Sequence, residues 1–348
     1  MVTTARRKTA TTLQYCLGIE STAHTFGAAV CTFDGGILSN VIDSFKTEKG
    51  GMVPGEVANH HVEVCDTVIA QALEKAGGSR GAGLRMKDIS LISFSQSPGI
   101  GHCLRIGAMT SRSLSVLHGV PLIGVNHCIA HLEIARLLTP AKDPVLLYAS
   151  GANTQVIGYE GKKYRVFGET LDTGVGNVLD TFARHIGLGF PGGPQVEKLA
   201  SQGKTLIDLP YSVKGMDVSF AGILTNVKRK WDSGKYSKED LCYSVQEHVF
   251  AMLVEVSERA MAHTEKQELV LGGGVGCNKR LQEMCRMMCE DRDAAFFVPE
   301  NQYLIDNAAM IAWLGVLQYQ AGERMTTEEA VIRPYVRTDD VVVTWRDG

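Results

Sequence analysis

Short runs of apolar and β-branched residues alternate with polar turns at the start of this chain. Tyr15–Glu20 is such a run, and the polar stretch 21–25 separates it from a second run at residues 26–33. Asp34-Gly-Gly36 then precedes a third run at residues 37–45. Runs of this length, bounded by Asp and Gly, are typical of strands joined by hairpin turns. The opening of the chain therefore predicts three consecutive strands.

The same succession of runs and turns returns in the second half of the chain. Residues 144–148, 155–159 and 164–169 are strand-like, and the polar turns 149–154 and 160–163 separate them. A repeat of this kind predicts an internal duplication, with two similar α/β lobes around a cleft. The order resembles the two-lobed actin, hexokinase and Hsp70-type ATPase (ASKHA) fold, in which the first turn holds nucleotide phosphates or metal. Chance alternation of short strands is the alternative.

The remaining patterns complete the predicted organisation. Further strands are expected at residues 89–97, 119–125 and 268–271, and helices at 53–77, 104–118, from 127 onward, at 279–290 and at about 306–322. We expect residues 1–14 to be a disordered extension, 15–140 to form the first lobe and 141–348 the second. The final helix is expected to pack back on the first lobe.

Composition narrows the function classes. The chain of 348 residues is 45% hydrophobic and 21% charged, which is ordinary for a soluble protein of two domains. Its net charge of -3 leaves no overall basic surface for nucleic acid, so such contact requires a local patch or a partner. Nine cysteines without a Cys-x-x-Cys pair, and no secretory signal, predict free thiols in the cytoplasm. The apolar runs are too short or too interrupted to span a bilayer.

The pair His127 and His131 is the first candidate for chemistry. Positions i and i+4 lie on one helix face, so both imidazoles can reach one metal ion. His127 follows the carboxyl end of the predicted strand 119–125, where α/β proteins place ligands. A solvated or hydrogen-bonded helix face is the common alternative.

Asp306 and Tyr148 are further candidates for the same site. Asp306 stands near the start of the final predicted helix, where a simple N-cap is the ordinary interpretation. Tyr148 stands in a predicted strand, where it could simply face the core. Two imidazoles, a carboxylate and a phenol together would form a mixed nitrogen and oxygen site suited to zinc or iron.

Two further regions favour a nucleotide. A glycine-rich turn at residues 272–276 joins a strand to a helix, which allows close approach of backbone to a ligand, although it is neither a Walker nor a Rossmann motif. Asp180 and Glu197 flank a Pro/Gly-rich loop at 189–194, and carboxylates accept hydrogen bonds from ribose hydroxyls. Solvated helix carboxylates are the alternative.

Several motifs in order resemble one family. They are Gly18-Ile-Glu-Ser-Thr22, Ala58-Asn-His-His61, Asn126-His-Cys-Ile-Ala-His131, Tyr148-Ala-Ser-Gly-Ala-Asn-Thr-Gln155, Gly168-Glu-Thr-Leu-Asp172, Phe190-Pro-Gly-Gly-Pro194, Ser219-Phe-Ala-Gly222 and Asp306-Asn-Ala-Ala309. The chain thereby resembles the tRNA N6-adenosine threonylcarbamoyltransferases, formerly called O-sialoglycoprotein endopeptidases. Residues 244–253 and 336–340 are similar to the archaeal and eukaryotic branch, the catalytic subunit of the KEOPS complex.

The resemblance implies a reaction and a set of site residues. The threonylcarbamoyl group passes from threonylcarbamoyl-AMP to N6 of the adenosine 3′ of the anticodon, in tRNAs that read codons starting with A, and AMP is released. The family's metal ligands correspond to His127, His131, Tyr148 and Asp306, with iron and zinc both open. Its adenylate contacts, which would also hold ATP or AMP, correspond to Tyr148, Ala149, Ser150, Gly151, Ala152, Asp180, Gly193, Glu197 and Asn278.

Neither the catalytic base nor the tRNA contacts follow from the motifs. His60 and His61 are weak candidates for the base, and structural roles for them are at least as plausible. The small basic clusters at 228–230 and 6–8 do not suffice for specific tRNA recognition. The implied partners are therefore tRNA and the KEOPS subunits, which are a small dimerising subunit and a small atypical kinase with its own partner. That kinase is sometimes fused after the last strand, and the chain given ends before such a domain.

One departure and three rival functions remain at this point. Val53 and Gly55 stand where archaeal members usually carry His and a basic residue around a proline, which leaves tRNA handling open. A zinc metallopeptidase would need Glu at position 128, which is Cys. An ATP-dependent kinase or chaperone-type ATPase on the same fold is the second rival. Sugar kinases carry a catalytic Asp in the turn that corresponds to residues 150–154, which has none. A non-catalytic scaffold is the third rival.

Overall fold

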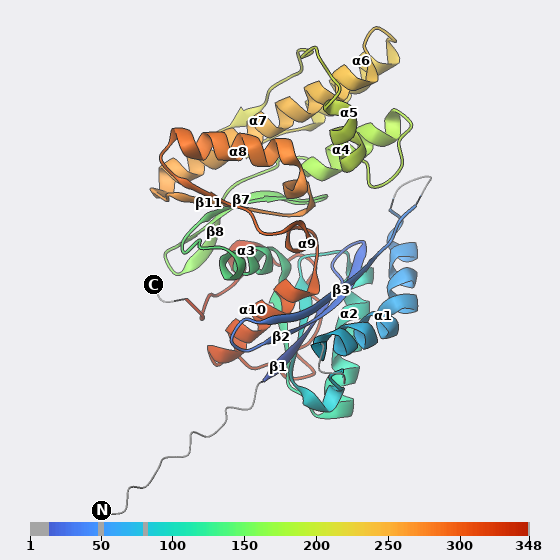
Figure 1. Ribbon diagram of the computed structural model, residues 1–348, viewed down its shortest axis with the longest axis vertical. Coiled ribbons are helices and arrows are strands. Elements are labelled where there is room, and N and C mark those ends of the chain that lie inside the picture. The colour runs from blue at the N-terminus through green and yellow to red at the C-terminus, as the bar shows by residue number, and fades with distance from the viewer. Residues whose placement is uncertain (1–13, 48–51, 79–82, 347–348) are drawn as a thin grey trace, which may run out of the picture.

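The computed structural model describes residues 14–47, 52–78 and 83–346, so nearly all of the expected extension 1–14 lies outside the described residues. Two five-stranded mixed sheets form the framework, and they occupy the lower and upper halves of Figure 1. The first sheet has the order β3-β2-β1-β4-β5. Its strands are β1 (Tyr15–Glu20), β2 (Thr25–Thr32), β3 (Ile37–Ser44), β4 (Ile89–Ser97) and β5 (Leu122–Asn126).

The second sheet repeats the first. Its order is β8-β7-β6-β11-β12, and its strands are β6 (Val145–Ala149), β7 (Thr154–Glu160), β8 (Lys163–Glu169), β11 (Glu268–Gly272) and β12 (Ala295–Phe297). In each sheet the first three strands along the chain are antiparallel neighbours, and the central strand pairs in parallel with the fourth. The predicted α/β duplication is confirmed.

Helices cover both faces of the first sheet. The helices α1 (Pro54–Ala76) and α2 (Gly101–His118) pack on one face, through a core that includes Leu17, Ile19 and Phe94. On the other face lie α3 (His127–Leu138) and α10 (Ala308–Gln320), whose apolar residues share one core with Cys16 and Ala29.

That same core also includes one face of the second sheet, through Leu146, Tyr148 and Val270. Helices α3 and α10 therefore lie between the two sheets, as Figure 1 shows. The opposite face of the second sheet is covered mainly by α4 (Val175–His185), α5 (Gly193–Ala200), α6 (Ala221–Asp232), α7 (Lys238–Thr264) and α8 (Lys279–Asp291).

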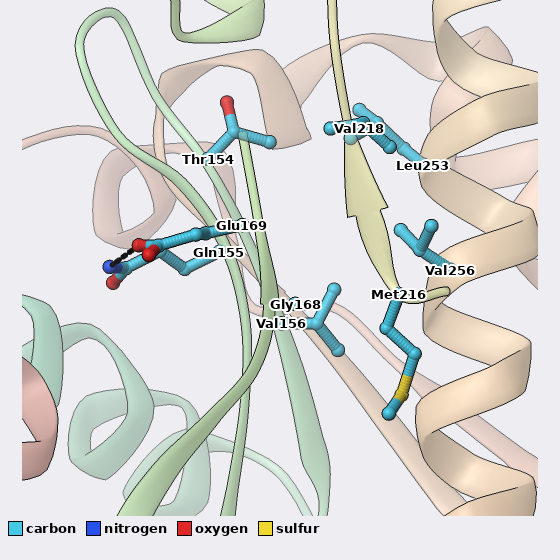
Figure 2. A pocket seen from close by; sticks show the side chains of 9 residues that line it. All are labelled: Thr154, Gln155, Val156, Gly168, Glu169, Met216, Val218, Leu253 and Val256. Carbon is cyan, nitrogen blue, oxygen red and sulfur yellow. Dashed lines mark hydrogen bonds between the residues drawn. The ribbon is translucent and has the colours of Figure 1, made fainter. Parts of the chain in front are cut away.

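The contact between β7, β8 and α7 shows that side chains of the second sheet alternate between its two faces. Figure 2 shows Val156 turned toward Leu253 and Val256 of α7, whereas Gln155 and Glu169 lie on the other side and are hydrogen bonded to each other at 3.2 Å. The alternation follows from the two-residue period of a strand. The remaining short elements are η2 (Met86–Asp88), β9 (Val213–Lys214), β10 (Asp217–Val218), η3 (Gly274–Cys277), α9 (Asn301–Leu304) and η4 (Thr338–Asp340).

Several predicted boundaries differ from the structure, and three of them have a local explanation or bear on the site. Helix α2 begins at Gly101, three residues before the predicted start. The strand predicted from residue 119 begins at Leu122, because Gly119 has φ 65° and ends α2 in the left-handed conformation. The final helix begins at Ala308, and its N-cap is Asn307, whose side chain accepts from Met310 N at 3.1 Å.

The contact between β1 and α10 requires glycine. A Cβ atom at Gly18 would lie 2.4 Å from the Ala308 carbonyl oxygen and 2.6 Å from Ala312 N. Both are backbone atoms, so no side-chain rotation would relieve the overlap. The absence of a side chain at Gly18 is what lets the last helix lie directly against the central strand. Among the described residues, no helix is long and apolar enough to cross a membrane.

Candidate active site

The histidine pair is positioned by the junction between β5 and α3. Asn126 ends the strand and caps the helix, since its side chain accepts from Cys128 N at 3.0 Å and Ile129 N at 3.2 Å. His127 is therefore the first residue of α3, and His131 lies one turn further on. Both side chains are buried, and their ring centroids are 4.8 Å apart.

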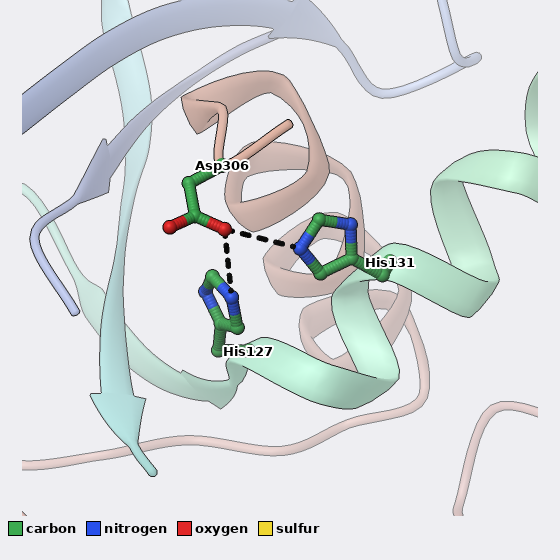
Figure 3. Close-up of side chains that lie close together, drawn as sticks. All are labelled: His127, His131 and Asp306. Atoms are coloured by element: carbon green, nitrogen blue, oxygen red, sulfur yellow. Dashed lines mark ion pairs between the residues drawn. The ribbon is translucent and has the colours of Figure 1, made fainter. Parts of the chain in front are cut away.

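Asp306 approaches this pair from the segment between α9 and α10. Because Asn307 caps α10, the Asp306 carboxylate is free to face the histidines, which contradicts its interpretation as a simple helix cap. Its Oδ1 lies 3.2 Å from His127 Nε2 and 3.5 Å from His131 Nε2, as Figure 3 shows. The ligand atoms of the three residues all lie within 4.8 Å of one another.

Tyr148 completes the group from the second sheet. It is the fourth residue of β6, and its hydroxyl lies 3.1 Å from His127 Nε2. Its ring centroid is 4.9 Å from that of His131. The structure thus brings together all four residues of the predicted metal set, from α3, β6 and the segment between α9 and α10.

The donor set fits a metal ion. Among the described residues, Nδ1 of His131 is buried without any hydrogen-bond partner, and its Nε2 makes no hydrogen bond beyond the 3.5 Å approach of Asp306. Buried polar atoms are rarely left so. Two imidazole nitrogens and a carboxylate oxygen lie within 4.8 Å of one another, and the Tyr148 hydroxyl lies 3.1 Å from Nε2 of His127. Mixed nitrogen and oxygen ligands of this kind suit zinc or iron.

The electrostatics of the cluster favour the metal-binding forms of two of its residues. Burial raises the pKa of Asp306, but the neighbouring His127 outweighs that effect and holds the pKa well below its ordinary value. Burial also lowers the pKa of His131. At neutral pH Asp306 is therefore ionised and His131 neutral, which are the states in which these side chains bind metals.

His127 and Tyr148 show the opposite direction. Burial opposes the charging of His127, but Tyr148, Glu20 and Asp306 together hold its pKa well above the ordinary value. The pKa of Tyr148 is raised, chiefly by burial. Protons held at these two positions would have to leave if the four side chains bound a cation, and such binding would therefore release protons.

Glu20 is a residue of the site that the sequence analysis missed. It is fully buried at the end of β1, and its Oε2 lies 3.0 Å from His127 Nδ1. A signal was present in the sequence: an acidic residue at the end of an otherwise apolar strand is unusual, because it becomes buried without water.

The predicted nucleotide residues lie at the end of β6 and in the turn after it, on α4, on α5 and at the N-cap of α8. The turn 149–152 follows β6, and the glycine-rich segment packs on it so closely that a Cβ at Gly273 would lie 2.3 Å from the Ala149 carbonyl oxygen. The start of α4 closes the turn from the other side, where Gly176 N donates to Ser150 O at 3.0 Å and Asn177 N to Gly151 O at 3.0 Å.

The polar residues predicted to bind the nucleotide also accept hydrogen bonds from neighbouring backbone N–H groups. Asp180 accepts from Gly192 N at 2.7 Å and from Gly193 N at 3.2 Å, and its pKa is raised because it is buried. Glu197 accepts from Lys279 N at 2.9 Å. Asn278 caps α8 by accepting from Arg280 N at 2.9 Å and from Leu281 N at 3.3 Å. Direct contact of these side chains with a nucleotide stays a prediction.

The histidines of α1 make other contacts. His60 Nε2 lies 3.2 Å from Asp43 Oδ1. His61 is buried, its Nε2 lies 2.9 Å from the Ala23 carbonyl oxygen, and burial lowers its pKa to about 4. Ala23 belongs to the turn between β1 and β2, so the contact with His61 links α1 to that turn.

The departure from the family motif lies at the start of α1. Val53 is the N-cap and makes no side-chain cap, and Pro54 begins the helix. Val53 is exposed, and a Cβ added at Gly55 would meet no atom within 4 Å. The departure therefore leaves an open surface rather than a rearranged core.

Comparison with known proteins decides the family. Residues 36–313 match the family model described as tRNA N6-adenosine threonylcarbamoyltransferase. The chain belongs to this family. It is accordingly a transferase, and its reaction modifies adenosine in tRNA.

The relatives extend the match over nearly the whole chain. The tRNA N6-adenosine threonylcarbamoyltransferase of Thermococcus kodakarensis is 53% identical over 329 residues, which are 94% of this chain and 99% of the relative. A probable bifunctional tRNA threonylcarbamoyladenosine biosynthesis protein of Methanocaldococcus jannaschii is 51% identical over 95% of this chain, but this match covers only 60% of the relative.

Solved structures support the fold alone. HypF of T. kodakarensis matches with a TM-score of 0.62 at 15% identity, over 92% of this chain and 49% of that chain. Component A of the (R)-2-hydroxyglutaryl-CoA dehydratase of Acidaminococcus fermentans matches with a TM-score of 0.55 at 13% identity, over 88% of this chain and 99% of that chain. The two-lobed ASKHA prediction agrees with these neighbours.

Proposed function

We propose that this transferase moves the threonylcarbamoyl group from threonylcarbamoyl-AMP to N6 of the adenosine 3′ of the anticodon, in tRNAs that read codons starting with A, and releases AMP. The observation that carries the proposal is the convergence of His127, His131, Tyr148 and Asp306 between the two sheets, in a chain of this family.

The metal centre supplies one part of the chemistry. We assign His127, His131, Tyr148 and Asp306 as its ligands, with iron and zinc both compatible with the donors. A bound cation at this point would stabilise negative charge that gathers on the departing AMP phosphate. Three of the four residues stand on α3 and β6, and Asp306 stands in the short segment between α9 and α10, next to the N-cap Asn307.

We assign the nucleotide to the turn after β6 and to residues of α4, α5 and the N-cap of α8. The backbone of Ala149, Ser150, Gly151 and Ala152 would face the phosphate side, because this turn directly follows the strand that carries Tyr148. Asp180, Gly193, Glu197 and Asn278 would contact the adenosine. Their internal hydrogen bonds keep the site preorganised, which serves the alignment of the carbamoyl carbon with the incoming amine.

His61 is assigned a structural role. A base for this reaction has to accept a proton near neutral pH, and a group whose pKa lies near 4 does so poorly. Its bond to the Ala23 carbonyl oxygen fixes the turn that follows β1. His60 contacts Asp43 of β3.

Partners are expected to supply tRNA recognition. The net charge of -3 gives this chain no overall attraction to RNA, and most RNA affinity comes from neutralised phosphates. We therefore place the chain in a KEOPS-type assembly in the cytoplasm, with a small dimerising subunit and a small atypical kinase. The longer bifunctional relative is compatible with a second activity that cooperates with this one.

The rival functions find less support at the site. A peptidase would need a general base beside His127, but position 128 carries a buried cysteine whose pKa is raised by burial. A phosphotransferase would need a carboxylate in the turn after β6, and Ser150-Gly-Ala-Asn-Thr154 has none.

The test combines the chain with radiolabelled threonine, bicarbonate, ATP, a synthase that makes threonylcarbamoyl-AMP, tRNA that reads codons starting with A, and the partner subunits. Label in tRNA is counted for wild type, for His127→Ala and for the distant control Lys87→Ala. We expect incorporation by wild type and control, and a loss of more than 100-fold for His127→Ala. Equal incorporation by all three would exclude a metal-assisted reaction, and none by assembled wild type would exclude the transferase.

A further inference from the structure

Glu20 is a carboxylate buried where no lysine or arginine pairs with it. Its side chain is inaccessible to solvent, and among the described residues its only ion-pair partner is His127. Burial of a carboxylate is costly unless it is paired and hydrogen bonded. A residue of this kind, at the end of a central strand, therefore requires an explanation beyond packing.

The carboxylate has two differently occupied oxygens. Oε1 accepts from Thr22 N at 2.6 Å and from Thr22 Oγ1 at 2.6 Å. Oε2 lies 3.0 Å from His127 Nδ1. The first oxygen is thus fixed by the turn that follows β1, and the second is directed at one edge of the imidazole.

The two edges of the His127 ring face different environments. Nδ1 faces Glu20, whereas Nε2 faces Tyr148 at 3.1 Å and Asp306 at 3.2 Å. An imidazole whose Nδ1–H donates to a carboxylate has its proton fixed on that nitrogen, and its Nε2 lone pair is directed at the metal position.

We propose that Glu20 is a positioning residue of the metal centre. It accepts the Nδ1–H of His127, fixes the ring orientation, and makes Nε2 the stronger donor of the two imidazoles. This inference rests on the metal centre assigned above and goes beyond its ligand set.

His131 provides the internal contrast. Its Nδ1 is buried and has no hydrogen-bond partner among the described residues. The two histidines of the pair are therefore not equivalent: Nδ1 of His127 faces a carboxylate, whereas Nδ1 of His131 faces none, and His131 has only Asp306 at 3.5 Å from its Nε2. The first is the anchoring ligand of the pair.

The turn after β1 is itself rigid, so it can act as a support. Ser21 N donates to Ser95 Oγ at 2.9 Å, and a Cβ at Gly99 would lie 2.7 Å from the Thr22 carbonyl oxygen. Thr22 Oγ1 also lies 3.2 Å from His127 Nδ1, so Thr22 and Glu20 hold the same edge of the ring.

Glu20→Gln is the informative substitution. Thr22 N donates to the oxygen at the Oε1 position, so the amide places its carbonyl there and its NH2 toward His127. An amide NH2 donates, which requires a bare Nδ1 and moves the ring proton to Nε2, the atom needed by the metal. The substitution keeps the size of the side chain but reverses the hydrogen bond.

A matched control exists on the same helix as His127. Glu133 is 1% exposed, almost as buried as Glu20, but its partners are Tyr164, Arg136 and Trp345, away from the metal cluster. Glu133→Gln therefore removes a buried carboxylate charge without touching the histidines. It tests whether any such loss weakens metal binding.

The experiment measures the affinity for Zn²⁺ by chelator competition, and the visible spectrum after loading with Co²⁺, for purified wild type, Glu20→Gln, Thr22→Val and Glu133→Gln. We expect Glu20→Gln to weaken Zn²⁺ binding by about 10- to 100-fold and to change the Co²⁺ bands. Thr22→Val, which leaves the carboxylate in place, should show a smaller loss, and Glu133→Gln should match wild type in both measurements.

The outcomes separate the two proposals. Wild type that binds neither ion would overturn the metal centre itself. Wild-type affinity and spectrum in folded Glu20→Gln would overturn the role of Glu20 alone, as would an equal loss in Glu133→Gln. If Glu20→Gln does not fold, the smaller change in Thr22→Val decides, and an unchanged affinity and spectrum there would contradict the proposed support.

Discussion

Gly18→Ala tests the contact that places Asp306 in the site. The added Cβ would lie 2.4 Å from the Ala308 carbonyl oxygen and 2.6 Å from Ala312 N, so α10 has to move away from β1. Overpacking of this kind costs about 1–3 kcal/mol, and backbone contacts place it near the upper end. The lower entropy of the unfolded alanine chain returns about 0.5–1 kcal/mol. We expect a net destabilisation of about 2 kcal/mol.

The consequence for the site follows from the chain path. Asp306 stands two residues before Ala308, so a shift of the start of α10 also moves the carboxylate relative to His127 and His131. We expect Gly18→Ala to bind Zn²⁺ about tenfold more weakly than wild type, which corresponds to about 1.4 kcal/mol.

Urea unfolding and chelator competition measure the two effects. Gly55→Ala is the control, because a Cβ there would meet no atom within 4 Å and the position is helical. Its free energy of unfolding should equal that of wild type or exceed it by up to about 1 kcal/mol. Wild-type stability and affinity in Gly18→Ala would refute the reasoning, since β1 and α10 could then not be packed as described.

Three further outcomes are expected. His61 has a pKa near 4 when folded and near 6.5 when unfolded, so the unfolded chain binds the extra proton and the free energy of unfolding falls as pH drops from 6.5 to 4. His61→Gln should remove about 2 kcal/mol of this pH dependence, measured by urea unfolding across that range. Asp180→Ala leaves Gly192 N and Gly193 N without their acceptor, and we expect it to weaken AMP binding, measured by calorimetry, about tenfold. Unchanged AMP binding would show that Asp180 is not part of the nucleotide site. Asn307→Ala removes the α10 cap, and should cost about 1–2 kcal/mol in thermal unfolding.

Local sequence patterns were sufficient to predict most helices and strands and part of the candidate site. The hairpin around Asp34-Gly-Gly36 and its later copy predicted the duplicated sheets, because turn chemistry and strand period are local properties. The spacing of His127 and His131 likewise predicted one shared helix face. The ends of elements were less predictable, as the start of α2 shows, where nothing local marks Gly101 as helical.

Contacts between distant segments were not accessible to the same reasoning. Glu20 and His127 are separated by 107 residues, and their meeting depends on the pairing of β1 with β4 and of β4 with β5. Asp306 and Asn307 are adjacent polar residues with equal claims to cap a helix. Only the packed position of α10 decides which of them faces the histidines.

The duplication of the sheets has a consequence at the imidazole ring of His127. Strands β1 and β6 are the central strands of the two sheets and occupy equivalent places in them. Each delivers one side chain to His127: Glu20 reaches one nitrogen, and Tyr148 the other. The same structural position thus carries an acid in one copy and a phenol in the other. The two lobes share one architecture, but their central strands present different side chains to the two nitrogens of the same imidazole.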